Sequence, residues 1–251
     1  MQIVFLGTGG GRVNVTHRFR STSGFVIQGS KNIYVDPGSG VVEDAKKYGI
    51  KLNKIDAIFV SHPHLDHAND MNILIEAMTN ATQNKKGILF GPQTVISSSK
   101  NFGISLSDYH RSLLDEVFVL KPKKKVKLEE FTLTATKAKH DNTKGIGFVL
   151  DMDGKRIGYT GDTEYFKEIS DEYKDLDLLI INILRAENKW EGHLDKHSAL
   201  RLIKEAKPKI AILTRFGGEY IHISAELIAE WIEKESGIRT IASYDGMRFE
   251  L

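Results

Sequence analysis

Four side chains able to bind a metal ion fall within six residues, in the segment His-Pro-His-Leu-Asp-His that runs from His62 to His67. Alternation along an extended loop points His62 and His64 in the same direction, so this pair can bind one cation. Asp66 and His67 lie where a helix begins and face elsewhere, which suits a second cation about 3.5–4 Å from the first, as in two-metal hydrolases. Three of the nine histidines of the chain are in this window, so a chance surface cluster is a poor alternative.

The composition limits which metal such a site can hold. The chain has no cysteine, so any transition metal must be bound by histidine and carboxylate. Ligands of these types suit zinc, manganese or iron. We expect one or two divalent ions, with zinc as the first choice and manganese or iron as alternatives.

The pattern His-x-His-x-Asp-His after a predicted strand resembles the signature of the metallo-β-lactamase superfamily, and the similarity extends over nearly the whole chain. The resemblance implies a further ligand at His140, which would complete the first site. It also implies that Asp162, in a Gly-Asp-Thr turn, joins both ions, and that Asp36, in an Asp-Pro-Gly turn, orients the ligands from behind. The order and spacing of these residues favour the metal roles over those of ordinary loop residues. The predicted ligands are His62, His64, Asp66, His67, His140 and Asp162.

The resemblance breaks where the second site is normally closed by a histidine in a Leu-Thr-His segment. This chain reads Leu-Thr-Arg there, and the guanidinium of Arg215 stays protonated and cannot bind a cation. Three outcomes follow, in order of preference: one tightly bound ion at the three-histidine site; a weak second ion on Asp66, His67 and Asp162; or replacement by His222, seven residues further on. Arg215 could instead pair with Asp66 or Asp162, bind a substrate phosphate or carboxylate, or face solvent at a strand end.

Two features resemble the branch of the superfamily that includes ribonuclease Z and the cyclic-phosphate phosphodiesterases. The opening Phe-Leu-Gly-Thr-Gly-Gly-Gly is similar to the start of that branch, although a glycine-rich turn is a weak phosphate signal by itself. His193 lies 22 residues before Arg215, close to the interval that the branch keeps between its catalytic histidine and its last ligand. By resemblance His193 would steady the phosphoryl oxygens or protonate the leaving group, with His197 as a rival. Arg20, in the long loop after the first strand, is a candidate substrate contact.

Ribonuclease Z itself is a poorer match, because its tRNA-clamping arm lies between the ligands that correspond to His140 and Asp162. Only 21 residues separate them here, which leaves no room for the arm. The chain also resembles a set of uncharacterised archaeal metallo-hydrolases. A small phosphoester or a short, single-stranded nucleic acid is therefore the expected substrate.

The leading hypothesis is a metal-dependent phosphodiesterase in which water activated by the metal attacks phosphorus. Asp66 is the expected proton acceptor or water-orienting group, and Asp162 holds the ion. A thioester or lactone hydrolase of the glyoxalase II type is an alternative, because the same water attacks carbonyl carbon. A second alternative is a non-catalytic metal or ligand sensor in which Arg215 has abolished turnover.

These side chains must be positioned by short strands and amphipathic helices. Strand-forming runs at 3–6, 24–27, 32–35 and 57–60 precede the histidine segment. Apolar residues at i, i+3, i+4 and i+7 predict a helix between Asp66 and Met78. Further strands are predicted within 126–162 and at 178–181, 209–213, 240–243 and 247–251, with helices at 199–206, capped by Asp195, and 224–235.

Two halves, each with strands and then helices, predict a β-sandwich flanked by helices. The resemblance implies that this is an α/β (α+β) fold, the four-layer αββα metallo-β-lactamase sandwich of two mixed sheets flanked by helices. We expect one domain over residues 1–251. With 35 basic and 33 acidic side chains the net charge is only +2, so there is no general attraction for nucleic acid or anionic membranes, and binding of polyanions must be local. The absence of a basic leader and of a long apolar run favours a cytoplasmic protein without a membrane partner. A homodimer is left open.

Overall fold

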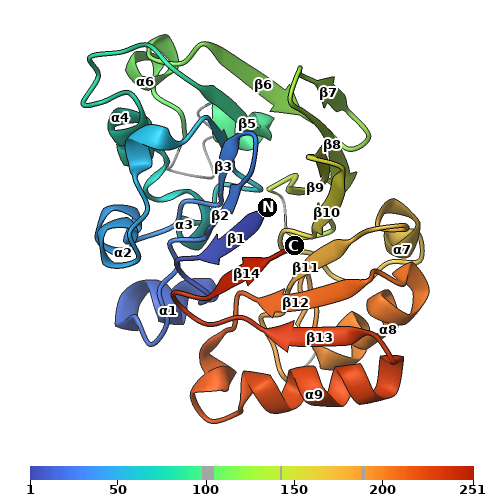
Figure 1. Cartoon of the computed structure of the whole chain (residues 1–251). Coiled ribbons are helices and arrows are strands. Elements are labelled where there is room, and N and C mark those ends of the chain that lie inside the picture. Colours follow the sequence, from blue (N-terminus) through green and yellow to red (C-terminus); the bar gives the residue numbers. More distant parts are fainter. Residues whose placement is uncertain (98–104, 142, 188–189) are drawn as a thin grey trace.

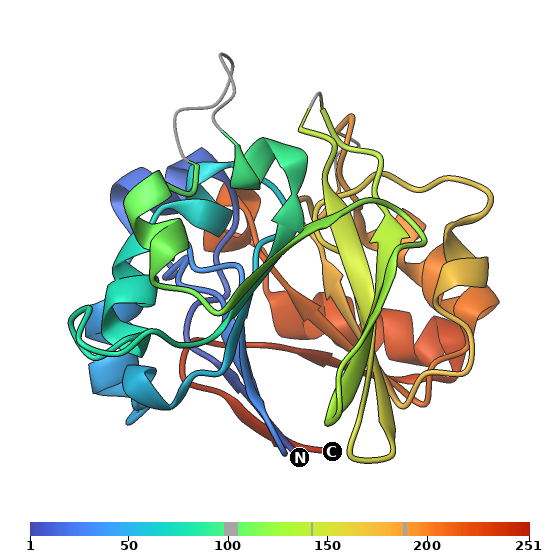
Figure 2. The same ribbon diagram turned by 90° about the horizontal axis from the view of Figure 1, so that it is seen from above.

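Two seven-stranded β-sheets pack face to face, and helices cover the outer face of each, in a computed structural model that describes residues 1–97, 105–141, 143–187 and 190–251 (Figures 1 and 2). The predicted four-layer αββα sandwich is confirmed. Within these described residues, no helix is both long and apolar enough to cross a lipid bilayer.

The first sheet has the strand order β14-β1-β2-β3-β4-β5-β6. Strands β3 to β6 run parallel to one another, whereas β1 is antiparallel to both β2 and β14. Pairing of β1 with β14 brings the two ends of the chain together, at one edge of the molecule in the view of Figure 2. The strands are β1 (Gln2–Phe5), β2 (Phe25–Gln28), β3 (Asn32–Val35), β4 (Ala57–Phe59), β5 (Ile88–Pro92), β6 (Glu116–Leu120) and β14 (Arg248–Glu250).

The second sheet has the order β13-β12-β11-β10-β9-β8-β7. Strands β10 to β13 are parallel, and β7 to β10 form an antiparallel meander, so both sheets are mixed, as predicted. The strands are β7 (Lys125–Lys127), β8 (Phe131–Lys137), β9 (Ile146–Met152), β10 (Lys155–Tyr159), β11 (Leu178–Asn182), β12 (Ile210–Thr214) and β13 (Arg239–Ala242).

The alternation of side chains along each strand explains the layers. In β1, Ile3 and Phe5 belong to the core between the sheets, while Val4 and the following Leu6 belong to the core under the helices of the first sheet. A third core cluster lies between the second sheet and α7, α8 and α9. The helices are α1 (Gly11–His17), α2 (Val41–Lys47), α3 (Leu65–Ala68), α4 (Met71–Met78), α5 (Gln93–Ile96), α6 (Asp108–Ser112), α7 (Ile169–Glu172), α8 (Lys196–Ala206) and α9 (Ala225–Ser236), with short 3-10 turns η1 (Leu52–Lys54) and η2 (Gly218–Ile221).

The helix predicted from the apolar stripe is confirmed as α4, but it does not extend back to Asp66, because the chain is interrupted between α3 and α4. Asp70 accounts for the break. Its backbone N–H donates to the carbonyl of Pro37 at 3.0 Å, and its carboxylate accepts from the N–H groups of Gly40 and Val41, where α2 begins. All apolar residues of the predicted stripe are nevertheless buried. The break lets α3 carry metal-binding side chains while α4 covers the sheet.

Two helix caps agree with the sequence. Asp195 accepts hydrogen bonds from the backbone of His197 and Ser198 and so caps α8, as predicted. Ser224 caps α9 in the same way through the N–H of Leu227. In contrast, the long loop expected after the first strand contains the helix α1, which has no apolar stripe that could have revealed it.

Candidate metal centre

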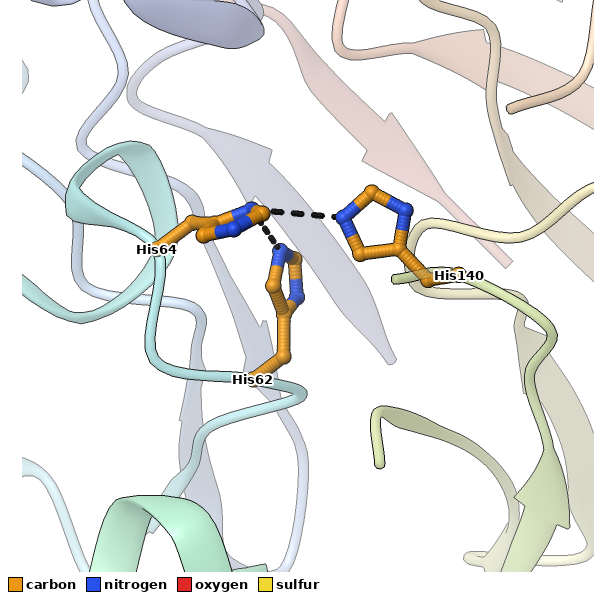
Figure 3. A group of neighbouring side chains, drawn as sticks. All are labelled: His62, His64 and His140. Atoms are coloured by element: carbon orange, nitrogen blue, oxygen red, sulfur yellow. Dashed lines mark hydrogen bonds between the residues drawn. The ribbon is translucent and has the colours of Figure 1, made fainter. Parts of the chain in front are cut away.

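Three histidines from two distant segments converge beyond the ends of the strands. His62 and His64 follow β4, and His140 follows β8. The Nδ1 atom of His64 lies 3.1 Å from Nε2 of His62 and 3.2 Å from Nε2 of His140 (Figure 3). Three imidazole nitrogens directed at one another can hold one divalent cation, and these atoms all lie within 4.8 Å. We call His62, His64 and His140 the three-histidine site.

The protonation states of this site suit a metal. Burial lowers the pKa of His62 well below its ordinary value, and burial also lowers the pKa of His64. Both rings are therefore neutral near pH 7, the form in which imidazole binds a cation. A cation at this site does not have to displace a proton from either residue.

A second group of donors consists of Asp66, His67 and Asp162, which we call the carboxylate site. The Nε2 atom of His67 lies 3.2 Å from Asp66 Oδ2 and 3.4 Å from Asp162 Oδ2. It is buried and makes no hydrogen bond with any described residue. A buried nitrogen that faces two carboxylate oxygens without a hydrogen bond has the chemistry of a metal ligand. The described residues contain three possible metal-binding groups, namely His62 with His64 and His140, His62 with His67 and Asp162, and His140 with Asp162 and His193. His67 and Asp162 therefore fit a cation, whereas Asp66 belongs to none of these groups.

The side chains of the carboxylate site favour their charged forms, in contrast to His62 and His64. Burial and Arg215 oppose protonation of His67, but Asp162, Asp66 and Asp36 outweigh them and raise its pKa well above the ordinary value. Burial likewise opposes ionisation of Asp66 and Asp162, yet the adjacent His67 holds the pKa of both carboxyl groups below their ordinary range. A proton on His67 is therefore the competitor that a second cation has to displace.

Asp36 lies behind the carboxylate site, where the sequence placed it. Its Oδ2 atom is 2.7 Å from Nδ1 of His67 and accepts hydrogen bonds from the hydroxyl groups of Ser61 and Tyr159, at 2.7 and 2.5 Å. Asn182, at the end of β11, donates to Tyr159 at 3.0 Å and to Oδ1 of Asp162 at 2.7 Å. A continuous hydrogen-bond chain thus connects two ligands of the carboxylate site through the core.

Arg215 is buried, with 1% of its surface exposed, so the solvent-facing alternative is wrong. Its guanidinium donates to backbone carbonyl oxygens of four residues that are far apart in the sequence, namely Gly9, Thr22, Asp36 and Asp66. Its nearest carboxylate oxygen is Oδ2 of Asp36 at 3.9 Å, and the described residues show no ion pair with the carboxylates of Asp66 or Asp162. Arg215 therefore contributes a fixed positive charge beside the carboxylate site. Because it makes no ion pair with the carboxylates of Asp66 and Asp162 in the described part of the chain, both remain candidate metal ligands.

The glycine-rich turn fits closely against this arginine. A Cβ atom on Gly10 would lie 2.6 Å from the carbonyl oxygen of Arg215, so only glycine allows the two backbones to approach this closely. The next residue, Gly11, donates its N–H to Oδ2 of Asp66 at 2.7 Å. These backbone contacts account for the glycines at positions 10 and 11 of the turn.

His193 lies at the metal centre, whereas its rival His197 does not. The Nδ1 atom of His193 is 3.5 Å from Oδ2 of Asp162, and burial lowers the pKa of His193 despite this carboxylate. His197 lies on α8, where its ring packs against Trp231. His222 ends η2 and is exposed, and none of the three possible metal-binding groups among the described residues includes it.

Arg20 contacts residues outside the metal centre. Its guanidinium stacks over the ring of Phe216, 4.9 Å from the centroid, and donates to the hydroxyl of Thr8 at 3.2 Å. It lines a surface hollow of about 420 Å³ together with Phe19 and Tyr220, and no proposed metal ligand lines this hollow. A contact of Arg20 with substrate remains a prediction.

Several residues of the centre were missed by the sequence analysis. Ser61 and Asp141 are direct neighbours in sequence of the ligands His62 and His140, and this adjacency is the only signal they give. Asn182 stands at the end of a buried strand, and a polar residue in that position could have been recognised as facing the site.

Comparisons with known proteins agree with this geometry. A model of the beta-lactamase superfamily domain matches residues 31–216. The protein MJ1374 of Methanocaldococcus jannaschii is 34% identical over 255 residues, which cover 100% of this chain and 95% of that protein. Ribonuclease Z of Saccharolobus solfataricus is 23% identical, with 90% of this chain and 92% of the relative covered. The structure of the metallo-beta-lactamase fold protein YhfI from Bacillus subtilis matches with a TM-score of 0.79 at 22% identity and covers 100% of this chain and 99% of that one. The chain therefore belongs to the beta-lactamase superfamily and is a metal-dependent hydrolase.

Proposed function

We propose that this protein is a phosphodiesterase that works with one tightly bound divalent cation at the three-histidine site. The observation that carries the proposal is the position of Arg215, a buried cation where the superfamily pattern places the last ligand of a second ion. Zinc is the proposed ion, and manganese or iron fits the same donors. The choice of phosphodiester substrates is supported by the relatives that carry the name ribonuclease Z.

His62, His64 and His140 would hold the ion, and Asp162 would approach it through Oδ2, which lies 4.0 Å from Nε2 of His62. When bound, a divalent cation supplies Lewis acidity and favours deprotonation of a water near neutral pH. Asp66 stays ionised because of its lowered pKa and is fixed by the N–H of Gly11. A carboxylate of such low basicity is a poor proton acceptor. Of the two roles considered for Asp66, orienting the attacking water therefore fits better than accepting the proton of that water.

His193 is proposed to contact the phosphoryl group. Burial keeps its pKa low, so the ring is neutral near pH 7 and can donate one N–H to a phosphoryl oxygen. Of the two roles considered for His193, steadying the phosphoryl oxygens therefore fits better than protonating the leaving group.

The proposed substrate is a small phosphoester or a short single-stranded nucleic acid. Strands β9 and β10 form an antiparallel pair that occupies most of the interval between His140 and Asp162. This interval is where ribonuclease Z is expected to carry its tRNA-clamping arm, and the pair of strands leaves little chain for one. We further propose that residues 1–251 act as one domain, since the core between the sheets includes residues from both ends of the chain.

The test combines metal analysis with two substrates, bis-p-nitrophenyl phosphate and a thioester. We expect about one bound ion per chain and hydrolysis of the phosphodiester that disappears in His64→Ala. His197→Ala is the matched control, because this histidine lies outside the metal centre, and it should keep both ion and activity. Hydrolysis of the thioester alone would replace the proposal by the glyoxalase II type of activity. A bound ion with neither activity would favour the sensor.

A further inference from the structure

Each of the four histidines predicted as metal ligands has its second ring nitrogen in contact with a different group. Nδ1 of His62 contacts Oγ of Ser61 at 3.0 Å, Nδ1 of His67 contacts Asp36 at 2.7 Å, and Nδ1 of His140 contacts the carbonyl of Gly192 at 2.9 Å. His64 is oriented the other way round. Its Nδ1 atom faces the other two histidines, and its Nε2 atom faces outward.

The outward nitrogen of His64 meets a carboxylate. Oδ2 of Asp141 lies 2.9 Å from Nε2 of His64, a distance typical of a hydrogen bond with a charged acceptor. The other oxygen of Asp141 accepts from the backbone N–H of Thr143 at 2.9 Å, which fixes the direction of the carboxylate. Asp141 also follows His140 directly in the sequence, so one turn of chain supplies both a proposed ligand and the partner of another.

We propose that Asp141 is a positioning residue of the three-histidine site, which keeps the proton of His64 on Nε2 so that the Nδ1 lone pair faces the cation. This inference rests on the proposed single-ion site. The negative charge of Asp141 makes the imidazole of His64 a stronger donor, as carboxylate partners of metal-binding histidines do in general. Asp141 thereby gives the three-histidine site the kind of anionic support that Asp36 gives to His67.

Two simpler roles for Asp141 are less consistent with the structure. The first is the role of a metal ligand. Asp141 belongs to none of the three possible metal-binding groups among the described residues, and the ring of His64 lies between the Asp141 carboxylate and the other histidines. A surface ion pair is the other alternative, since 46% of the Asp141 side chain is exposed and such pairs stabilise proteins very little. A surface pair would affect neither the tautomer of His64 nor the affinity for the metal.

The experiment measures zinc affinity by competition with a chromogenic chelator in Asp141→Ala, Asp141→Asn and the wild type. Loss of a carboxylate partner of a metal-binding histidine weakens metal binding by about 10–100-fold, and we expect this for Asp141→Ala. Asp141→Asn retains an acceptor oxygen without the charge and should lie between Asp141→Ala and the wild type. Asp171→Asn is the matched control, because Asp171 is an exposed partner of Lys174 on α7 and belongs to none of the possible metal-binding groups among the described residues, so this variant should bind zinc as the wild type does.

Nitrogen-detected NMR of the histidine rings in the metal-free protein gives an independent readout. The wild type should show His64 with its proton on Nε2, and Asp141→Ala should show a mixture of both tautomers. Unchanged zinc affinity in Asp141→Ala, or an unchanged tautomer, would overturn the inference. If the wild type hydrolyses no phosphodiester but these differences are present, the proposed function fails while the role of Asp141 stands.

Discussion

The two halves of the metal centre have the same number of protein donors but opposite electrostatic surroundings. In the three-histidine site, burial keeps the pKa of both His62 and His64 low, so these two rings are neutral near pH 7. The carboxylate site contains His67, whose pKa is raised, and it lies beside the buried guanidinium of Arg215. A cation therefore enters the first half without displacing a proton from these two rings, whereas in the second half it meets a proton and a fixed positive charge.

From this difference we expect that the number of potential ligands alone does not decide how many metal ions the centre binds. His67 lies within 3.4 Å of carboxylate oxygens of both Asp66 and Asp162, but the possible metal-binding groups among the described residues combine His67 and Asp162 with His62 and do not include Asp66. Arg215 already neutralises part of their negative charge, and repulsion between like charges is strong where water is excluded. The carboxylate site thus resembles a site in which a protein cation has taken over part of the role of the second metal.

The largest expected effect contrasts one histidine from each half. His140→Ala should reduce bound zinc from about one ion per chain to nearly none and abolish activity, because the remaining two histidines hold zinc weakly. His67→Ala should keep about one ion, since it removes a donor from the other half only. Elemental analysis after dialysis measures both. Equal zinc loss in the two variants would show that the halves form one indivisible site.

The next effect concerns stability. Arg215→Met should lower the free energy of unfolding by about 3–5 kcal/mol, because it removes the donor that several buried carbonyl groups share. Urea denaturation of the metal-free protein measures this difference without a contribution from metal binding. Arg215→Lys serves as the control that retains the charge but has fewer donors, and it should be destabilised less. Wild-type stability in Arg215→Met would mean that these carbonyl groups find other partners.

Arg215→His sharpens the contrast directly. The substitution removes the fixed charge and introduces a neutral donor, so bound metal should rise from about one ion to about two. Calorimetric titration with zinc should then resolve a second binding event that the wild type lacks. A single event in both proteins would show that the new ring does not reach the carboxylate site.

A smaller effect is the pH dependence of the second ion in Arg215→His. Because the folded-state pKa of His67 is raised, the ring carries a proton below that value and a metal must displace it. Affinity for the second ion should therefore increase as the pH rises through this pKa, with release of up to about one proton. Titrations in two buffers of different ionisation enthalpy count the protons. Affinity that stays constant from pH 6 to pH 9 would contradict the protonated state of His67.

Much of this centre could be predicted from the sequence. The features that could not be predicted have one property in common, which is that they depend on contacts with residues distant in the chain. The ligands from His62 to His67 are adjacent in the chain, so their types and spacing are visible without a structure. Most strands of the two sheets were predictable from strand-forming runs, although β5 and β6 were missed. The interruption of the helix at Asp70 was not predictable, because it depends on hydrogen bonds with residues some 30 positions earlier. The position of Asn182 at the end of a buried strand was a visible signal, but its partners Tyr159 and Asp162 are at least 20 positions earlier and are identified only by the structure.

The sequence alone determined which groups can bind a metal and that an arginine stands where a further ligand was expected. Both follow from residue type, because an arginine side chain remains protonated in any environment that the fold can offer. Only the tertiary structure decided where that charge goes. The guanidinium is held by carbonyl groups of Gly9, Thr22, Asp36 and Asp66. Backbone oxygens carry no signal in the sequence, and segments so far apart in the chain come together only when the core between the layers has formed.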